Sequence, residues 1–168
     1  MVYYLSLGSN LGNRRENIEN GILHLAAQGR VGPISSFYRT RPQGMLPGTP
    51  DFLNLALRME SGLIPRHLLG WIKVIETAMG HDLRTGPPRS RYLDADILLA
   101  GHHVCETHSL TIPHPRMTRR AFVLVPLAEI APHVVHPVLG QTIVELLSRL
   151  QNHDGVLRVE NPPFGSGE

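Results

Sequence analysis

Hydrophobic residues alternate with other residues along positions 92–100, which is the pattern of a pleated β-strand. Asp94 and Asp96 then lie side by side on one face of this strand. Adjacent carboxylates repel each other and lose solvation, so such a pair is expected where a divalent cation or a proton compensates it. The apolar positions predicted for the opposite face are Leu93, Ala95, Ile97 and Leu99.

The remaining pattern predicts three more strands and several helices in an order that indicates the fold class. In chain order, we expect a strand over 1–7, a helix over 13–29, strands over 31–39 and 52–59, a helix over 65–80 and the acidic strand. After a turn at 101–103, segment 104–112 is expected to complete a hairpin, and short helices follow over 126–130 and 142–150. The proline-rich and glycine-rich segment 40–50 is expected to be a long loop and a candidate lid or binding loop.

Helix boundaries are marked by capping residues at three positions. Asn13 followed by Glu16, and Thr142 followed by Glu145, have the spacing of capping boxes. Pro65 suits the first turn of a helix, where its missing N–H has no partner to lose.

The order strand, helix, strand, strand, helix, strand predicts a ferredoxin-like βαββαβ sandwich of the α+β class. In this fold an antiparallel sheet carries helices packed on it, here with C-terminal additions. We expect one domain over residues 1–160 and a loose tail over 161–168. Many unrelated functions use this fold, so the function must come from the site.

Composition narrows the classes of function. The chain has 168 residues, 42% of them apolar, and a formal charge of only +2, which argues against nucleic-acid binding. Lys73 is the single lysine among 16 Lys and Arg residues. The single cysteine, Cys105, excludes an internal disulfide. With no secretory leader, lipidation motif or apolar run of about 18 residues, we expect a cytoplasmic protein without membrane contact.

Arginines cluster just before the acidic strand in the sequence and suggest a phosphate ester as ligand. Arg84, Arg89 and Arg91 precede it, and Arg is the better fork for phosphate oxygens. Two aspartates one residue apart form a weak motif alone, which solvated edge strands also show. Mg²⁺ is the natural ion if a metal binds here, because it takes few protein carboxylates and completes its shell with phosphate and water.

His114 is the histidine that stands out, because two prolines fix its backbone and arginines follow it. It suits a donor to a phosphate oxygen. Six other histidines are expected in solvated turns or termini, namely His102, His103, His108, His133, His136 and His153. No zinc spacing or glycine-rich phosphate-binding loop is present. Phe52 and Asn54 on strand 52–59 offer an aromatic ring beside an amide, a grip for a flat heteroaromatic ring or merely an exposed sheet face. Gly8 permits close backbone approach to a ligand.

Five motifs in order resemble those of the 6-hydroxymethyl-7,8-dihydropterin pyrophosphokinase family of folate biosynthesis. They are Gly8-Ser9-Asn10-Leu11-Gly12, Ser35-Ser36-Phe37-Tyr38-Arg39-Thr40, Asp51-Phe52-Leu53-Asn54, Leu93-Asp94-Ala95-Asp96-Ile97-Leu98 and Pro113-His114-Pro115-Arg116-Met117. The resemblance runs from the first strand to about Leu139. The family's tryptophan before the acidic strand is absent from Pro87-Pro88-Arg89-Ser90-Arg91.

The resemblance implies a Mg-dependent diphosphotransferase with two Mg²⁺ ions, which moves the β,γ-diphosphate of ATP onto the pterin hydroxymethyl oxygen and releases AMP. It implies that Asp94 and Asp96 hold both metals. The implied pterin site is Gly8, Thr40, Phe52, Asn54 and Phe122. The implied ATP site is Glu76, Arg84, Arg91, the backbone of Ile97, His114 and Arg120, with Arg91, Asp94, Asp96, His114 and Arg120 as the catalytic set.

The expected partners are ATP and the pterin, with a monomer that works alone or beside dihydropteroate synthase. Two other hypotheses stay open. One is a different Mg-dependent, nucleotide-using transferase with the same acidic strand, which a pterin competition assay separates. The other is a non-catalytic ligand-sensing module, which has no use for paired aspartates facing an arginine cluster.

Overall fold

The structure is a computed structural model that describes residues 1–42, 47–80, 90–151 and 155–159. The predicted tail over 161–168 lies outside these residues. The elements, in chain order, are β1 (Val2–Ser9), α1 (Arg14–Ala26), β2 (Arg30–Ile34), β3 (Tyr38–Thr40), β4 (Phe52–Glu60), α2 (Pro65–Ala78), β5 (Asp94–Ala100), β6 (Cys105–Glu106), β7 (Thr111–Ile112), a 3₁₀ turn (Met117–Arg119), α3 (Ala121–Ile130), α4 (Ile143–Ser148) and β8 (Val156–Arg158).

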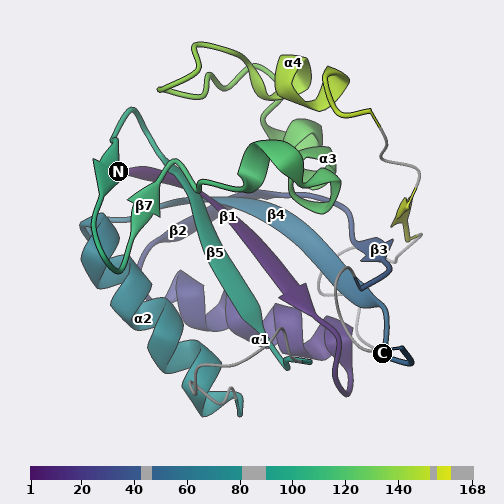
Figure 1. Cartoon of the computed structure of the whole chain (residues 1–168). Coiled ribbons are helices and arrows are strands. Elements are labelled where there is room, and N and C mark those ends of the chain that lie inside the picture. The colour runs from purple at the N-terminus through teal and green to yellow at the C-terminus, as the bar shows by residue number, and fades with distance from the viewer. Residues whose placement is uncertain (43–46, 81–89, 152–154, 160–168) are drawn as a thin grey trace.

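The main sheet is antiparallel and has β1 near its centre (Figure 1). The strand order is β5-β1-β4-β3-β8, with β2 also pairing with β4. β1 therefore lies between the two strands that carry most of the predicted site, β4 and β5. This arrangement confirms the predicted ferredoxin-like α+β fold. Segment 104–112, expected to complete a hairpin after the acidic strand, instead forms a separate two-stranded sheet of β6 and β7.

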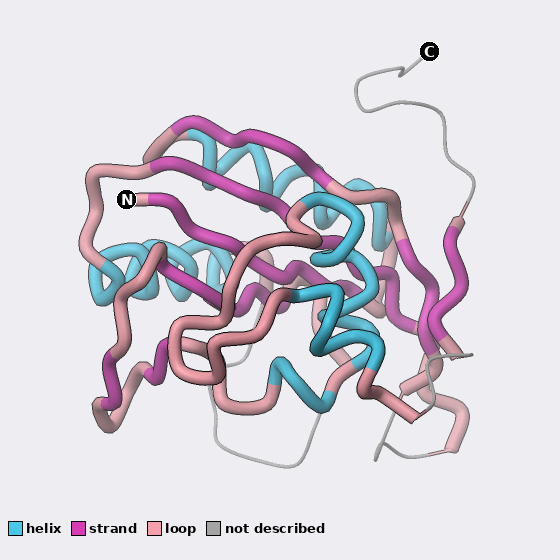
Figure 2. Tube along the Cα trace, turned by 90° about the horizontal axis from the view of Figure 1, so that it is seen from above, coloured by secondary structure: helices cyan, strands magenta, loops and turns pink. Residues whose placement is uncertain are grey.

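Each face of the sheet has its own apolar layer, and Figure 2 shows helices (cyan) on both sides of the strands (magenta). The larger layer joins residues of α1 and α2 to the sheet, including Ile18, Leu68 and Leu57. The smaller layer joins the other face to α3 and α4 through residues such as Leu124 and Leu146. The C-terminal additions thus cover part of the face that the first two helices leave open.

Local signals set several boundaries correctly. Asn13 accepts a hydrogen bond from the Glu16 amide at the start of α1, and Thr142 and Glu145 form a complete capping box. α1 ends at Ala26, three residues before Gly29. A side chain at Gly29 would place its Cβ 2.2 Å from the Glu60 carbonyl oxygen, so this glycine permits two chain segments to cross rather than ending the helix.

The predicted face of Leu99 is wrong because β5 contains an irregularity. The register against β1 shifts between Tyr4 and Leu5, which pair with Leu99 and Ile97. Leu98 and Leu99 both contribute to the α3-side layer, whereas Ile97 faces the other layer. One extra residue in a strand reverses the alternation that follows it.

Three further predictions required correction. The strand expected over 31–39 is divided into β2 and β3 by residues 35–37. The helix expected to begin at Pro126 already begins at Ala121, because buried Val123 and Leu124 pack it on the sheet. His136, expected to be solvated, is buried, and this burial lowers its pKa. β8 was not predicted.

Among the described residues, no helix is long and apolar enough to cross a membrane.

Candidate active site

The acidic pair lies on the face of β5 that points toward α3. Asp94 is opposite Gly8 and Asp96 is opposite Ser6 in the register with β1. Ala95, between them, is buried in the opposite layer. The two carboxylate side chains remain 33% and 39% exposed, so both can reach a ligand from solvent.

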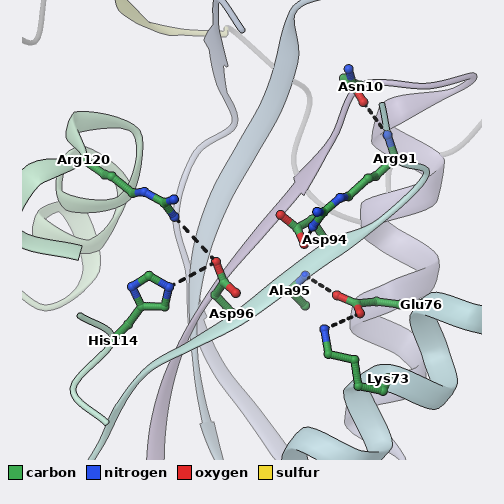
Figure 3. Close-up of polar contacts among 9 residues, drawn as sticks. All are labelled: Asn10, Lys73, Glu76, Arg91, Asp94, Ala95, Asp96, His114 and Arg120. Atoms are coloured by element: carbon green, nitrogen blue, oxygen red, sulfur yellow. Dashed lines mark hydrogen bonds and ion pairs between the residues drawn. The ribbon is translucent and has the colours of Figure 1, made fainter. Parts of the chain in front are cut away.

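Three cationic or basic side chains from separate segments surround this pair (Figure 3). Arg91, just before β5, forms an ion pair with Asp94. Nε2 of His114, which follows β7, lies 3.7 Å from Asp96 Oδ2. Nη1 of Arg120, at the N-cap of α3, lies 3.9 Å from the same oxygen. The fold therefore brings together the catalytic set expected from the sequence.

Asp96 is short of positive charge in this arrangement. Burial raises its pKa, and the neighbouring Asp94 carboxylate raises it further, while His114, Arg120 and Lys73 act in the opposite direction. The net effect is a raised pKa, because the basic groups lie at a distance and solvate the carboxylate incompletely. A bound cation would supply the missing charge.

His114 is held as a neutral donor. Burial lowers its pKa despite the opposing Asp96 carboxylate, which favours the uncharged ring. Nδ1 of His114 accepts a hydrogen bond from the Arg116 amide at 3.1 Å, which leaves the proton on Nε2. That proton points toward the acidic pair, where a phosphate oxygen would accept it.

Arg120 is only loosely paired with Asp96, so its guanidinium can bind an anion. Its guanidinium lies 5.4 Å from the centre of the Phe122 ring, which supports it by a cation–π contact. Burial and the positive charge of Arg116 both lower its pKa. A guanidinium that is partly desolvated and close to another positive charge favours a planar, bidentate anion such as phosphate.

The neighbouring strands β3 and β4 form a buried amide site. Asn54 donates from Nδ2 to Thr40 Oγ1 at 2.8 Å, and both side chains are buried. Gly8 lies opposite Asn54 on β1, and a Cβ at Gly8 would be 2.8 Å from Asn54 Oδ1. Phe52 pairs with Thr40 at the start of β4. A side chain at position 8 would therefore displace the Asn54 amide, which glycine leaves in place.

Asn10 is a residue of this region that sequence reasoning missed. Its Oδ1 accepts from the Arg91 amide at 2.7 Å, and its own amide donates to the Arg91 carbonyl at 3.1 Å. Its Nδ2 donates to Ser90 Oγ at 3.0 Å and to the Pro50 carbonyl at 3.5 Å. The available signal was an asparagine between two glycines after a strand, which does not reveal partners about 40 and 80 residues away.

The remaining residues predicted to bind ATP lie in different environments. Glu76 lies on α2 with its carboxylate fully buried, bonded to the Ala95 amide and to Lys73. The side chain of Ile97 packs in the layer between the sheet and helices α1 and α2, so only its backbone is available to a nucleotide. Arg84 lies outside the described residues.

The donor set of the site fits magnesium. Asp94 and Asp96 supply two hard oxygen donors on one face of a strand. In the described parts of the chain, no group of three or more His, Cys, Asp and Glu side chains is placed to hold a metal ion. Two carboxylates without a complete protein cage suit an ion that shares its shell with phosphate oxygens and water.

Comparison with known proteins identifies the family to which the chain is similar. The family model described as 7,8-dihydro-6-hydroxymethylpterin-pyrophosphokinase (HPPK) matches residues 4–132. A 2-amino-4-hydroxy-6-hydroxymethyldihydropteridine pyrophosphokinase from Synechocystis is 40% identical over 148 residues, which cover 87% of this chain and 74% of that protein.

Longer relatives match as well. The folic acid synthesis protein FOL1 from Dictyostelium discoideum is 37% identical over 96% of this chain, which spans only 24% of that protein. The crystal structure of Plasmodium falciparum HPPK-DHPS with pteroate superposes with a TM-score of 0.70 at 18% identity, over 88% of this chain and 44% of that one. That likeness shows the shared fold. The extent of the family match, together with the 40% identity to Synechocystis, shows that the chain belongs to the HPPK family.

Proposed function

We propose that this chain transfers the β,γ-diphosphate of ATP to the hydroxymethyl oxygen of 6-hydroxymethyl-7,8-dihydropterin. The products are AMP and the pterin diphosphate, as in tetrahydrofolate biosynthesis. The observation that carries the proposal is the pair Asp94 and Asp96 facing Arg91, His114 and Arg120, within one site. Family membership supplies the identity of the acceptor.

Asp94 and Asp96 would hold two Mg²⁺ ions in this proposal. The raised pKa of Asp96 and the open oxygen donors support a divalent cation at this face of β5. Bound magnesium supplies neutralisation of the phosphate charge that develops during transfer.

The protein groups around the pair would bind and orient the triphosphate. Arg91 and Arg120 approach the acidic pair from different segments, so each can pair with phosphate oxygens without leaving its element. His114 would donate from Nε2. Phosphoryl transfer needs in-line positioning and charge neutralisation more than covalent help from the protein. Arg84, Glu76 and the backbone of Ile97 remain predicted neighbours of the nucleotide.

The amide site would recognise the pterin edge. Asn54 and Thr40 hold a buried amide and hydroxyl together, and Gly8 leaves room beside them. Phe52 and Phe122 would sandwich the flat ring. A ring with several hydrogen-bonding groups is discriminated well by buried polar partners, because a wrong ligand leaves them unsatisfied.

Incubation of the purified chain with ATP, Mg²⁺ and 6-hydroxymethyl-7,8-dihydropterin tests the proposal. AMP and pterin diphosphate are measured by chromatography, with a matched reaction that lacks the pterin. We expect pterin-dependent AMP in a one-to-one ratio with pterin diphosphate. Binding of both ligands without AMP would favour a binding module, and ATP use with a different acceptor would favour another transferase.

We also propose that residues 1–160 act as one catalytic domain. The monomeric state, the cytoplasmic location and action beside dihydropteroate synthase remain predictions.

A further inference from the structure

Glu76 is a wholly buried carboxylate that lies behind the acidic strand. Its Oε1 accepts a hydrogen bond from the Ala95 amide at 2.9 Å (Figure 3). Its Oε2 lies 2.7 Å from Lys73 Nζ, one turn earlier on α2. The Glu76 side chain is 0% exposed, whereas that of Lys73 is 45% exposed. One end of this pair therefore remains hydrated while the other is enclosed.

The position of Glu76 would ordinarily take an apolar residue. It belongs to the buried face of α2, whose other members include Leu68, Ile72 and Ile75. Enclosing a carboxylate there costs free energy, and an apolar side chain of similar volume is often as stable or more stable. General stability thus gives little reason for a carboxylate at this position. The bond to β5 offers a specific one.

That bond reaches the one backbone amide between the two aspartates. Among the strands of the described residues, β5 is the terminal one, with the single neighbouring strand β1. Asp94 and Asp96 are in register with Gly8 and Ser6 of β1. Ala95 directs its amide to Glu76 instead. The acidic stretch is consequently held from both sides, by β1 and by α2.

We propose that Glu76 is a positioning residue, held by Lys73, which fixes the strand between Asp94 and Asp96 and so sets the geometry in which the two carboxylates bind metal. This proposal rests on the proposed function and deepens it. It differs from direct nucleotide contact, because both Glu76 oxygens already have partners within the protein. Groups that orient metal ligands commonly change metal affinity by about 10–100-fold when removed.

Two substitutions separate the hydrogen bond from the charge. Glu76→Leu removes the acceptor while filling the buried space, and Glu76→Gln keeps an oxygen for the Ala95 amide without the charge. Thr77→Ala is the control, because Thr77 is an exposed neighbour on α2 whose hydroxyl donates to the Lys73 carbonyl. Lysine at position 73 can hydrate in either variant, since it is already half-exposed.

The first measurement is amide hydrogen exchange of Ala95 by NMR in the ligand-free protein, with Tyr3 on β1 as the internal reference. The second is Mn²⁺ binding in the presence of ATP, measured by water proton relaxation. For Glu76→Leu we expect Ala95 exchange to accelerate about tenfold relative to Tyr3, and Mn²⁺ affinity to fall about tenfold or more. Glu76→Gln should restore both to within about threefold, and Thr77→Ala should change neither.

Three results would overturn the proposal. Glu76→Leu could leave Ala95 exchange and Mn²⁺ affinity unchanged while ATP affinity falls, which would mean direct nucleotide contact. Glu76→Gln could fail as fully as Glu76→Leu, which would mean that the charge matters rather than the acceptor. All variants could lose stability without a specific effect at Ala95, which would mean a packing role. The exchange measurement needs no turnover, so it stands even if the proposed reaction fails.

Discussion

The two halves of the site differ in how completely their polar groups are paired. In the amide half, Asn54 and Thr40 are buried and joined by a hydrogen bond of 2.8 Å. In the acidic half, Asp96 is 39% exposed, and its two basic neighbours, His114 and Arg120, lie 3.7 and 3.9 Å away. Asn54 and Thr40 therefore meet directly without a ligand, whereas the two basic neighbours of Asp96 remain beyond direct hydrogen-bonding distance.

This difference indicates two ways of using binding energy. A preformed amide site rejects wrong rings, because its groups are fixed and a mismatch leaves them unpaired. In the acidic half Arg91 pairs directly with Asp94, but the basic neighbours of Asp96 lie at a distance, and burial and Asp94 raise the pKa of Asp96. A metal ion and a triphosphate between these charges would complete the set. We therefore expect recognition from one half and charge neutralisation from the other.

Asp96→Asn should have the largest effect, and in opposite directions on turnover and stability. Loss of a metal ligand should lower kcat by about 10³-fold or more, because the phosphate charge is no longer neutralised. The ligand-free protein should gain a little stability, since burial and Asp94 both disfavour the Asp96 carboxylate. Solvent screens a side chain that is 39% exposed, so the melting temperature should rise by only about 1–2 °C.

The control for Asp96→Asn is Glu106→Gln, a neutralised acid on the exposed part of β6. It should change neither turnover nor melting temperature. If Asp96→Asn retained near-normal turnover, the acidic half would not be the metal site. If it lost stability sharply, the carboxylate would be well paired already, and the contrast between the halves would disappear.

Gly8→Ala should damage the amide half while leaving the acidic half intact. The new Cβ would lie 2.8 Å from Asn54 Oδ1, so the buried amide must shift and strain its bond to Thr40. We expect a loss of about 1–3 kcal/mol in unfolding free energy. The KM for the pterin should rise about tenfold, with the KM for ATP changing little.

Gly70→Ala is the matched control, because Gly70 lies within α2 and a Cβ there would meet nothing within 4 Å. This change should stabilise the protein by about 0.5–1 kcal/mol without changing either KM. Equal increases in both KM values for Gly8→Ala would show that the two halves are one coupled unit.

The fold and the central part of the site follow from local pattern. Alternation along 92–100 was enough to place Asp94 and Asp96 on one face, because the strand is regular up to Ile97. The same rule failed at Leu99, since an irregular pairing with β1 depends on the partner strand and is not encoded by alternation. Local capping residues likewise predicted helix starts better than helix ends.

The contacts that sequence could not predict are those between distant segments. Glu76 meets Ala95 across 19 residues, and Asn10 meets Arg91 across 81. β8 was missed because three residues, Val156–Arg158, form a strand only through pairing with β3. Such features depend on tertiary packing, which periodicity does not report. Motif resemblance named candidate ligand residues but not the groups that hold them.

Substitution of Asn10 should have the smallest effect on activity of the three substitutions. It tests whether the two halves are coupled, because Asn10 contacts segments from both. It holds the backbone of Arg91 on the acidic side and donates to the Pro50 carbonyl near the start of β4. Asn10→Ala should cost about 1 kcal/mol of stability by leaving the Arg91 amide unpaired. We expect kcat/KM for ATP to fall about fivefold, with the same change for the pterin if Asn10 couples the halves.

The control for Asn10→Ala is Asn17→Ala. Asn17 supports the same turn through Ser9 and Leu11 but makes no bond to Arg91 among the contacts of the described residues. It should lower stability without a selective effect on ATP. Asn10→Asp keeps the acceptor for the Arg91 amide but loses the hydrogen bonds donated to Ser90 and Pro50. It therefore isolates the bond to Arg91. If Asn10→Asp restores ATP kinetics but not pterin kinetics, the halves are joined through Pro50. If it restores both, the bond to Arg91 alone carries the effect on both substrates, and the Pro50 contact does not join the halves.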